Sequence, residues 1–232
     1  GYFKGRVTME IAERDSRISP EQLELSQQLA DAGIMETRFN RGFLTRTDGS
    51  PTRPEAAGLG VAFLGSLYMM MVVLALALPI GVATSIYLEE FAPKNRWTDL
   101  IEVNISNLAA VPSIVFGLFG LALFVTMFNL EVSVLSGSLT LGILILPIII
   151  ISTQEALRSI PTGIRESAYA LGGTRWQVIY SHVLPMAAPG IFTGVILALS
   201  RAIGETAPLI LIGALTFVPF LPQGALDQFT AL

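Results

Sequence analysis

The segment VSVLSGSLTLGILILPIIIIST, residues 132–153, contains no charged side chain. A helix of about 20 predominantly apolar residues crosses the ~30 Å hydrocarbon core of a bilayer. Residues 59–82 and residues 105–128 form two further uncharged segments of sufficient length. A fourth apolar stretch, residues 183–221, is interrupted by only two charged side chains. The sequence therefore predicts an all-α protein, a polytopic membrane bundle with four spanning helices.

The composition supports this class. The 232 residues are 52% hydrophobic and 14% charged, whereas soluble domains average about 25% charged residues. Residues 1–58 carry 17 of the 32 Lys, Arg, Asp and Glu side chains, so residues 59–232 are nearly uncharged. We expect two domains with this boundary, a polar helical segment and a transmembrane domain. The alternative, apolar helices buried in a large soluble protein, leaves too little polar sequence to cover them.

Residue counts exclude several kinds of functional site. The absence of cysteine excludes disulfides, thiolate zinc sites and a cysteine nucleophile. A single histidine, His182, excludes an imidazole cluster and an H-E-x-x-H metalloprotease. No Gly-rich phosphate loop followed by Lys is present, so we expect no ATP hydrolysis by this chain, no catalytic residue, no metal and no cofactor. The net charge of −4 gives no general attraction to nucleic acid.

The basic residues of the short loops predict the orientation in the membrane. The loops over residues 83–104 and 154–185 carry five Lys or Arg residues, while the turn at residues 129–131 and the segment after Ile210 carry none. Cytoplasmic loops are enriched in Lys and Arg. We therefore place the two basic loops in the cytoplasm and residues 1–58 outside, because long segments cross largely regardless of their charge.

The polar opening contains the signals of one helix. Ser19 is a candidate cap, Pro20 suits the first helical position, Gln22 completes a capping box and Gly33 ends the run. The opening has no apolar core, which excludes a signal peptide. Because no Met occupies position 1, we expect a fragment whose first membrane helix precedes Gly1.

The basic loop over residues 154–185 predicts two short helices around a break. The first begins at residues 159–161 and ends at Gly172 and Gly173; Thr174 caps the second, which ends at Pro185. An amphipathic pair this short cannot bury its apolar face alone, so it lies on the bilayer or in a groove of another protein. The apolar positions are Ile164, Ala168 and Leu171, and the polar side carries Arg165 and Glu166.

Five features of this loop resemble the EAA loop of ABC-importer permeases. They are Glu166, Ala168, Gly172, Leu184 and Pro185. The resemblance implies that the loop is a coupling element that docks in a groove of an ATPase subunit. An interfacial helix pair without a partner is the alternative.

Other segments are similar to phosphate-importer permeases of the PstA type. They include residues 46–50, 87–90, 92–97, 112–115 and 201–208. This resemblance implies a type I importer permease fold of the MetI-like kind, truncated at both ends, in the bacterial inner membrane. It also implies phosphate as the substrate and four partners: a dimeric ATP-binding subunit, a second permease, an external phosphate-binding protein and the lipid bilayer.

Two charged residues lie within the fourth apolar stretch. Arg201 and Glu205 are four residues apart, so in a continuous helix they share one face and can form an ion pair. A guanidinium suits phosphate oxygens and stays protonated. We interpret Arg201 as a cationic binding point on the path of an oxyanion. Glu205 would pair with the guanidinium when the substrate is absent. A structural ion pair and a position at the outer membrane edge are the alternatives.

The same stretch contains a predicted packing seam. Gly190, Gly194 and Ala198 recur every four residues, a pattern that lets membrane helices approach closely.

Two other function classes compete with the importer. A secondary transporter should show internal repeats with interrupted helices, which we do not find, and an assembly or signalling protein would use the ion pair only to fix helix register.

Overall fold

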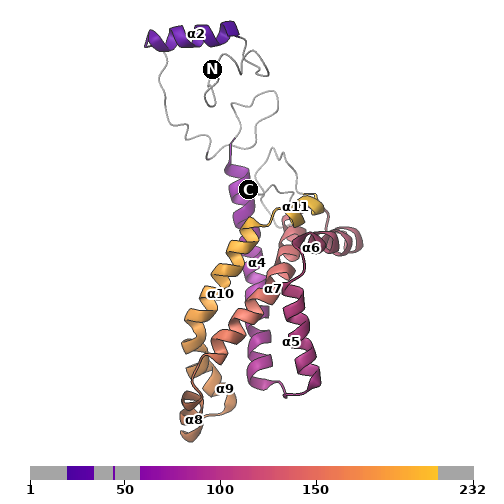
Figure 1. Ribbon diagram of the computed structural model, residues 1–232, viewed down its shortest axis with the longest axis vertical. Coiled ribbons are helices and arrows are strands. Elements are labelled where there is room, and N and C mark those ends of the chain that lie inside the picture. Colours follow the sequence, from indigo (N-terminus) through magenta and orange to yellow (C-terminus); the bar gives the residue numbers. More distant parts are fainter. Residues whose placement is uncertain (1–19, 34–43, 45–57, 214–232) are drawn as a thin grey trace. The chain divides into compact units, whose positions relative to one another are not determined.

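The computed structural model describes residues 20–33, 44 and 58–213, and every element in these ranges is a helix (Figure 1). The chain divides into two units, Gly1–Gly60 and Val61–Leu232. In the first unit, helix α2 covers Pro20–Asp31 and Gly33 follows it with φ of +71°, which confirms the predicted helix and its stop. The predicted cap, Ser19, lies outside the described residues.

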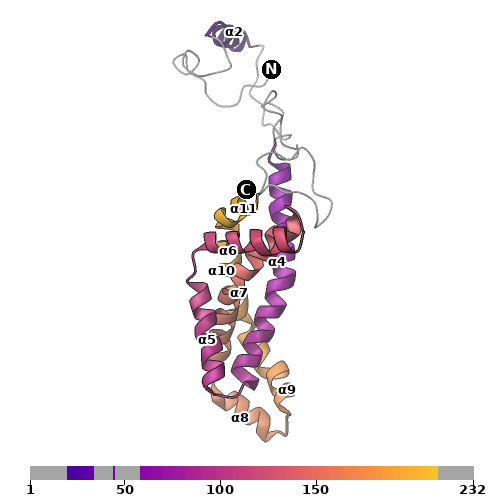
Figure 2. The same ribbon diagram turned by 90° about the vertical axis from the view of Figure 1, so that its right-hand side faces the viewer.

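Three long helices run through the second unit. Helix α4 (Gly60–Ile86), helix α7 (Val134–Arg158) and helix α10 (Leu184–Gly204) run along its length (Figures 1 and 2). Short segments extend two of them into continuous helices of 32 and 30 residues. The extensions are the π-helical turn η2 (Tyr87–Phe91) after α4, and helix α9 (Arg175–Val178) with the π-helical turn η4 (Ile179–Val183) before α10. All three continuous helices are long and apolar enough to cross a membrane.

The predicted continuous span over residues 105–128 is wrong. The chain forms helix α5 (Arg96–Ala109) and then, after a 99° bend, helix α6 (Ser113–Gly120) with the π-helical turn η3 (Leu121–Met127). Figure 2 shows α6 lying across the end of α5. Pro112 explains the bend, because proline lacks the backbone N–H of a helical hydrogen bond and disfavours helical backbone at the preceding residue. The span expected over residues 105–128 therefore exists only as part of this bent pair.

The last predicted span also ends earlier than expected. Helix α10 stops at Gly204, Glu205 has extended backbone with φ of −91° and ψ of 95°, and helix α11 covers Ala207–Ile212. Pro208 lies in the first turn of α11, where its missing N–H is tolerated, whereas it could not continue α10. Residues 214–221 of the predicted stretch lie outside the described residues.

Helix α7 is the centre of the packing. Its buried side chains pack on α4 and on α10, and a hydroxyl from α4 reaches its backbone: Ser85 Oγ donates to the Ile150 carbonyl at 2.9 Å. The predicted small-residue seam faces α7. A Cβ on Gly190 would lie 2.8 Å from Ala156 Cβ, and one on Gly194 would overlap the side chain of Ser152. The close approach of α7 and α10 therefore requires glycine at these positions.

We expect Gly194→Ala to destabilise the bundle by about 1–3 kcal/mol, because the new methyl group overlaps Ser152 of α7. Gly142→Ala is the matched control. A Cβ at Gly142 has no neighbour within 4 Å, so that change is expected to be neutral or to stabilise α7 by up to about 1 kcal/mol. Unfolding of the two variants in the same detergent measures the difference. Equal stability of both variants would show that the seam is loosely packed.

The predicted orientation has a direct test in this cysteine-free chain. We expect cysteines at Ser167 and at Phe128 to react with an impermeant thiol reagent from opposite sides of the membrane. Phe128 is 56% exposed and follows η3, whereas the nearby Ser133 is fully buried and unsuitable for labelling. Reaction of both cysteines from one side would contradict the assignment of residues 154–185 to the cytoplasm.

Candidate functional site

The predicted coupling loop forms a compact helical hairpin. Helix α8 covers Thr162–Ala170, and Gly172 follows it with φ of +82°, a conformation that favours glycine. Thr174 then starts α9 with a capping box: its side chain accepts from the Gln177 N–H at 3.4 Å, and the Gln177 side chain accepts from the Thr174 N–H at 2.9 Å. These features confirm the predicted pair of helices around a glycine break.

The predicted end of the second helix at Pro185 is wrong. The helix continues from α9 through η4 into α10, and Pro185 lies in the first turn of α10. In η4 the Leu184 N–H donates to the Ile179 carbonyl, five residues back. The wider π-helical turn accommodates the proline without ending the helix. The predicted loop over residues 154–185 thus contains the end of α7 and the start of the next membrane helix.

An open hollow of about 520 Å³ lies along α8. Ile164, Ala168 and Leu171, the predicted apolar positions, line it together with His182. Leu171 is 87% exposed, so an apolar side chain at the glycine turn is open to a partner. The other predicted coupling residues do not line the hollow: Glu166 and Pro185 are exposed and Leu184 is half-buried.

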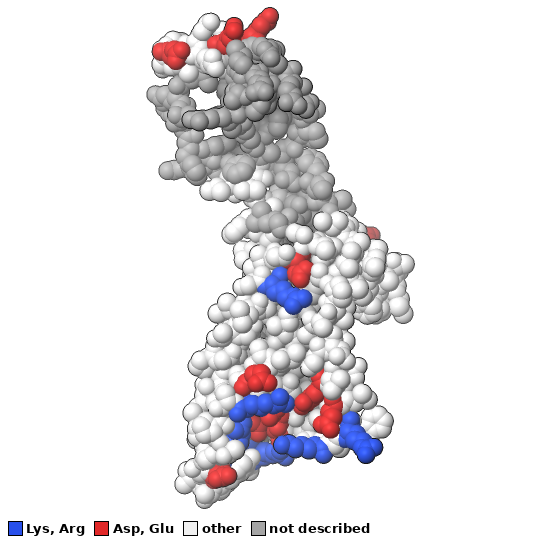
Figure 3. Space-filling model, viewed as in Figure 1, with Lys and Arg blue, Asp and Glu red and all other residues white. Residues whose placement is uncertain are grey.

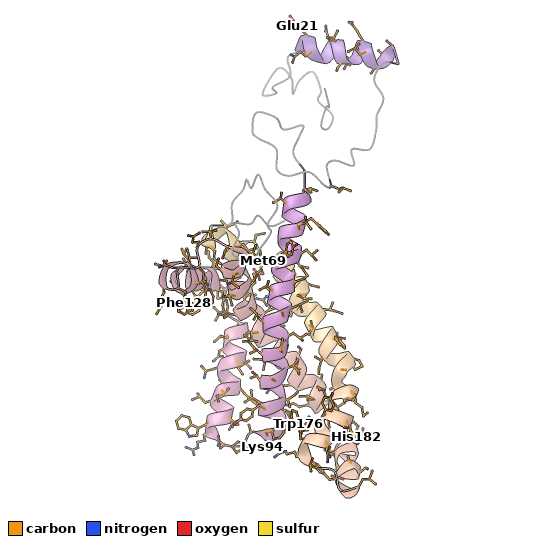
Figure 4. All side chains as sticks on the ribbon, turned by 180° about the vertical axis from the view of Figure 1, so that it is seen from behind. Glu21, Met69, Lys94, Phe128, Trp176 and His182 are labelled. Atoms are coloured by element: carbon orange, nitrogen blue, oxygen red, sulfur yellow. The ribbon has the colours of Figure 1, made fainter. Side chains whose placement is uncertain are left out.

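Charged side chains gather at the same end of the second unit (Figure 3). Figure 4 shows that Lys94, Trp176 and His182 lie toward this end, and Met69 and Phe128 lie toward the other. At this end, Arg158 of α7 pairs with Glu89 of η2 at 2.8 Å and with Glu102 of α5 at 3.4 Å. The ion pairs therefore tie three helices together where the sequence predicts the cytoplasm.

Arg165 differs from its predicted place on the polar side of α8. Its side chain is only 19% exposed, and its Nη2 lies 2.8 Å from Oε1 of Glu90, whose side chain is 10% exposed. The guanidinium also donates to the carbonyls of Leu157 and Ile160 at 2.9 and 2.8 Å. Sequence reasoning missed Glu89 and Glu90. The available signal was the pair of adjacent acidic residues after an apolar segment. Such a pair can bind the arginines of another loop on the same side of the membrane.

The predicted translocation pair forms at the other end of α10. Arg201 Nε lies 3.4 Å from Glu205 Oε1, and the two side chains are 43% and 20% exposed. The prediction that both lie within one helix is wrong, because α10 ends at Gly204, but the turn still brings the two charges together. Arg201 in the last helical turn also faces the negative end of the helix dipole. Figure 3 shows this region as a small charged spot among uncharged side chains.

The pair is far from the charged end of the unit. The continuous helix from Arg175 to Gly204 has 30 residues and is therefore about 45 Å long. Arg201 lies in its last turn and the coupling hairpin lies at its first turn. Within the described residues, no group of three His, Cys, Asp or Glu side chains could hold a metal ion.

The family described as "Binding-protein-dependent transport system inner membrane component" matches residues 77–229. The chain is 42% identical over 161 residues to the phosphate transport system permease protein PstA of Mycobacterium leprae, which is 68% of this chain and 52% of that protein. It is 37% identical over 163 residues to the probable ABC transporter permease protein YqgI of Bacillus subtilis, 69% of this chain and 55% of that protein. A PstA of Xylella fastidiosa is 37% identical over 161 residues, 69% of this chain and 56% of that protein. The chain spans about half the length of the curated relatives it matches.

Proposed function

We infer the function from one premise: this chain belongs to the family of binding-protein-dependent transport system inner membrane components. We propose that it is a membrane-spanning subunit of an ATP-driven importer that moves inorganic phosphate into the cytoplasm by alternating access. The observation that carries the proposal is the Arg201–Glu205 ion pair at the end of an apolar helix. The names of the PstA relatives support phosphate as the substrate.

Arg201 needs a polar environment that the lipid does not supply. Charged side chains within membrane-spanning segments almost always face a partner, the bundle interior or water rather than lipid. The Arg201 side chain is 43% exposed in this chain alone. We propose that this exposed face of α10 borders the substrate path, which a second permease subunit completes.

The pair provides reversible binding of an oxyanion. Arg201 offers a planar set of N–H donors that matches two phosphate oxygens. Glu205 pairs with the guanidinium at 3.4 Å, which is longer than a strong hydrogen bond, so a competing anion can displace it. An incoming phosphate thus replaces the Glu205 carboxylate as the partner of the Arg201 guanidinium. When phosphate leaves, Glu205 pairs with the guanidinium again. This exchange prevents the substrate from binding too tightly for release.

The hairpin of α8 and α9 is the proposed contact with a separate ATP-hydrolysing subunit, which we expect to be a dimer. Its apolar hollow and the exposed Leu171 offer a surface for a complementary partner. The same helix that carries Arg201 begins in this hairpin, so a displacement of the hairpin can reorient the pair. Glu166, Ala168, Gly172, Leu184 and Pro185 remain the proposed coupling residues.

The polar segment over residues 1–58 is proposed to lie outside the cytoplasm. It would then be on the side from which an external phosphate-binding protein delivers its ligand. The transmembrane domain, residues 59–232, carries both the proposed path and the coupling hairpin.

Transport by the assembled complex in lipid vesicles tests the proposed function. With ATP on the cytoplasmic side and a phosphate-loaded binding protein on the other, we expect uptake of labelled phosphate that stops without ATP. Sulfate on its own binding protein is the control anion. Uptake driven by an ion gradient without ATP would instead show a secondary transporter, and absence of all anion movement would leave an assembly role.

A further inference from the structure

The π-helical turn η2 at the end of α4 contacts the end of α7 and both helices of the coupling hairpin, α8 and α9. Three successive residues contribute. Glu89 binds Arg158 at the end of α7, and Glu90 binds Arg165 of α8. The ring of Phe91 lies 6.0 Å from that of Trp176 in α9. One turn therefore connects α4 with the end of α7 and with both hairpin helices.

The backbone of η2 allows this arrangement. Its closing hydrogen bond runs from the Ala92 N–H to the Tyr87 carbonyl at 2.7 Å, five residues back. Such a turn has more residues than an α-helical turn, so it changes the directions of successive side chains, and π-helical turns occur frequently at functional sites. The turn is not enforced by proline, because residues 87–91 contain none.

The Glu90–Arg165 pair is the strongest of the three connections. Both side chains are mostly buried, and Arg165 donates to Glu90 Oε1 through Nε at 3.2 Å and through Nη2 at 2.8 Å. The same guanidinium binds the carbonyls of Leu157 and Ile160, where α7 ends. Arg165 is thus a junction between α8, the C-terminal end of α7 and η2. Hydrogen bonds to a charged group at low exposure are the stronger kind.

The connection through Arg158 is weaker and redundant. Its side chain is 43% exposed and is shared among Glu89, Glu102 and Glu155. Exposed ion pairs contribute little, and one carboxylate can replace another. Loss of a single partner of Arg158 should therefore change little.

We propose that η2 passes the displacement of α8 to α4, and that Glu90 is a positioning residue that acts through Arg165. This inference rests on the proposed function. When a partner subunit moves α8, the guanidinium of Arg165 pulls the carboxylate of Glu90, and the end of α4 follows. The ring of Phe91, tilted against that of Trp176 and 5.1 Å from the Arg175 guanidinium, adds a second contact to α9. Hairpin movement thus reaches α4 directly as well as α10.

The Glu90→Gln variant of the complete complex in lipid vesicles tests the inference. Phosphate uptake and ATP hydrolysis are measured together. Glutamine keeps the size of the side chain but removes the charge that holds Arg165. We expect phosphate moved per ATP hydrolysed to fall about tenfold, because Arg165 then donates only to a neutral amide oxygen, which binds it less strongly than a carboxylate does. ATP hydrolysis without phosphate is expected to stay near its wild-type rate, which a general loss of structure would not allow.

Glu155→Gln is the matched control, because Glu155 is 68% exposed at the same end of the unit and pairs only with Arg158 among the ion pairs of the described residues. We expect wild-type coupling in this variant. In the double variant Glu90→Gln with Arg165→Met, the ratio should equal that of Arg165→Met alone, because Glu90 acts through Arg165. Additive losses would overturn this route.

Two other results decide between this inference and the proposed function. If the wild-type complex takes up phosphate and Glu90→Gln keeps the wild-type ratio, the inference is wrong and the proposed function stands. If the wild-type complex moves no phosphate, the proposed function fails and the inference fails with it. Should Glu90→Gln not assemble, Glu90→Asp decides, because a shorter carboxylate retains the charge and is expected to give an intermediate ratio.

Discussion

Complexes that carry Arg201→Ala are expected to lose phosphate uptake about tenfold to a hundredfold, because a hydrogen bond to a charged group contributes about 1.5–3 kcal/mol. The cation that receives the substrate is gone, and Glu205 remains as an unpaired negative charge that repels it. The measurement is the initial rate of labelled phosphate uptake, normalised to the amount of assembled complex in the membrane. Insertion is expected to be normal, because a neutral side chain enters the bilayer more readily than arginine.

Arg201→Lys should retain part of the uptake, because lysine keeps the charge but loses the planar set of donors. Arg96→Ala is the control for the loss of an arginine, since Arg96 is exposed at the start of α5, at the opposite end of the unit from α11. Uptake by Arg201→Ala near the wild-type rate would remove Arg201 from the path and leave the pair with a structural role.

The second large effect is expected at the glycine of the coupling hairpin. Gly172→Pro should abolish the stimulation of ATP hydrolysis by phosphate-loaded binding protein. Proline fixes φ near −65° and cannot adopt the observed +82°, and it removes the N–H that donates to the Tyr169 carbonyl at 2.9 Å. A proline is destabilising where the native φ is incompatible with it and the N–H was hydrogen-bonded. Stimulated and unstimulated ATP hydrolysis of the purified complex measure the loss.

The effect at Gly172 comes from backbone conformation rather than side-chain contact, because a Cβ there would have no neighbour within 4 Å. Gly172→Asn is therefore the matched control, since asparagine tolerates the left-handed region. We expect it to keep most of the stimulation. Full stimulation in Gly172→Pro, with the complex assembled, would exclude the hairpin as the coupling element.

The sequence predicted those features that depend on local pattern. Apolar segments predicted the three long helices, and the four-residue spacing of Gly190 and Gly194 predicted a packed seam. Gly172 and Thr174 predicted the stop and start of the hairpin helices, because a positive φ and a capping box each leave a local residue signature.

The sequence did not predict features that depend on the direction of a helix axis or on residues far apart in the chain. A bent helix and a straight one have the same composition, so residues 105–128 looked like one span despite Pro112. The apolar composition likewise continues past Gly204, so the end of α10 before Glu205 and the new helix that contains Pro208 were not predicted. The Glu90–Arg165 pair joins residues 75 positions apart, and no spacing rule links them.

Chemical restoration of charge at position 201 tests the central claim most directly. The chain lacks cysteine, so Arg201→Cys offers one thiol in this subunit to a water-soluble reagent. In a complex whose other subunits lack reactive thiols, we predict that an aminoethyl reagent attaches a cation and restores part of the phosphate uptake. A neutral reagent of similar size should attach and restore none. A thiol that no water-soluble reagent reaches in any nucleotide state, or equal uptake after both reagents, would contradict a path for anions beside Arg201.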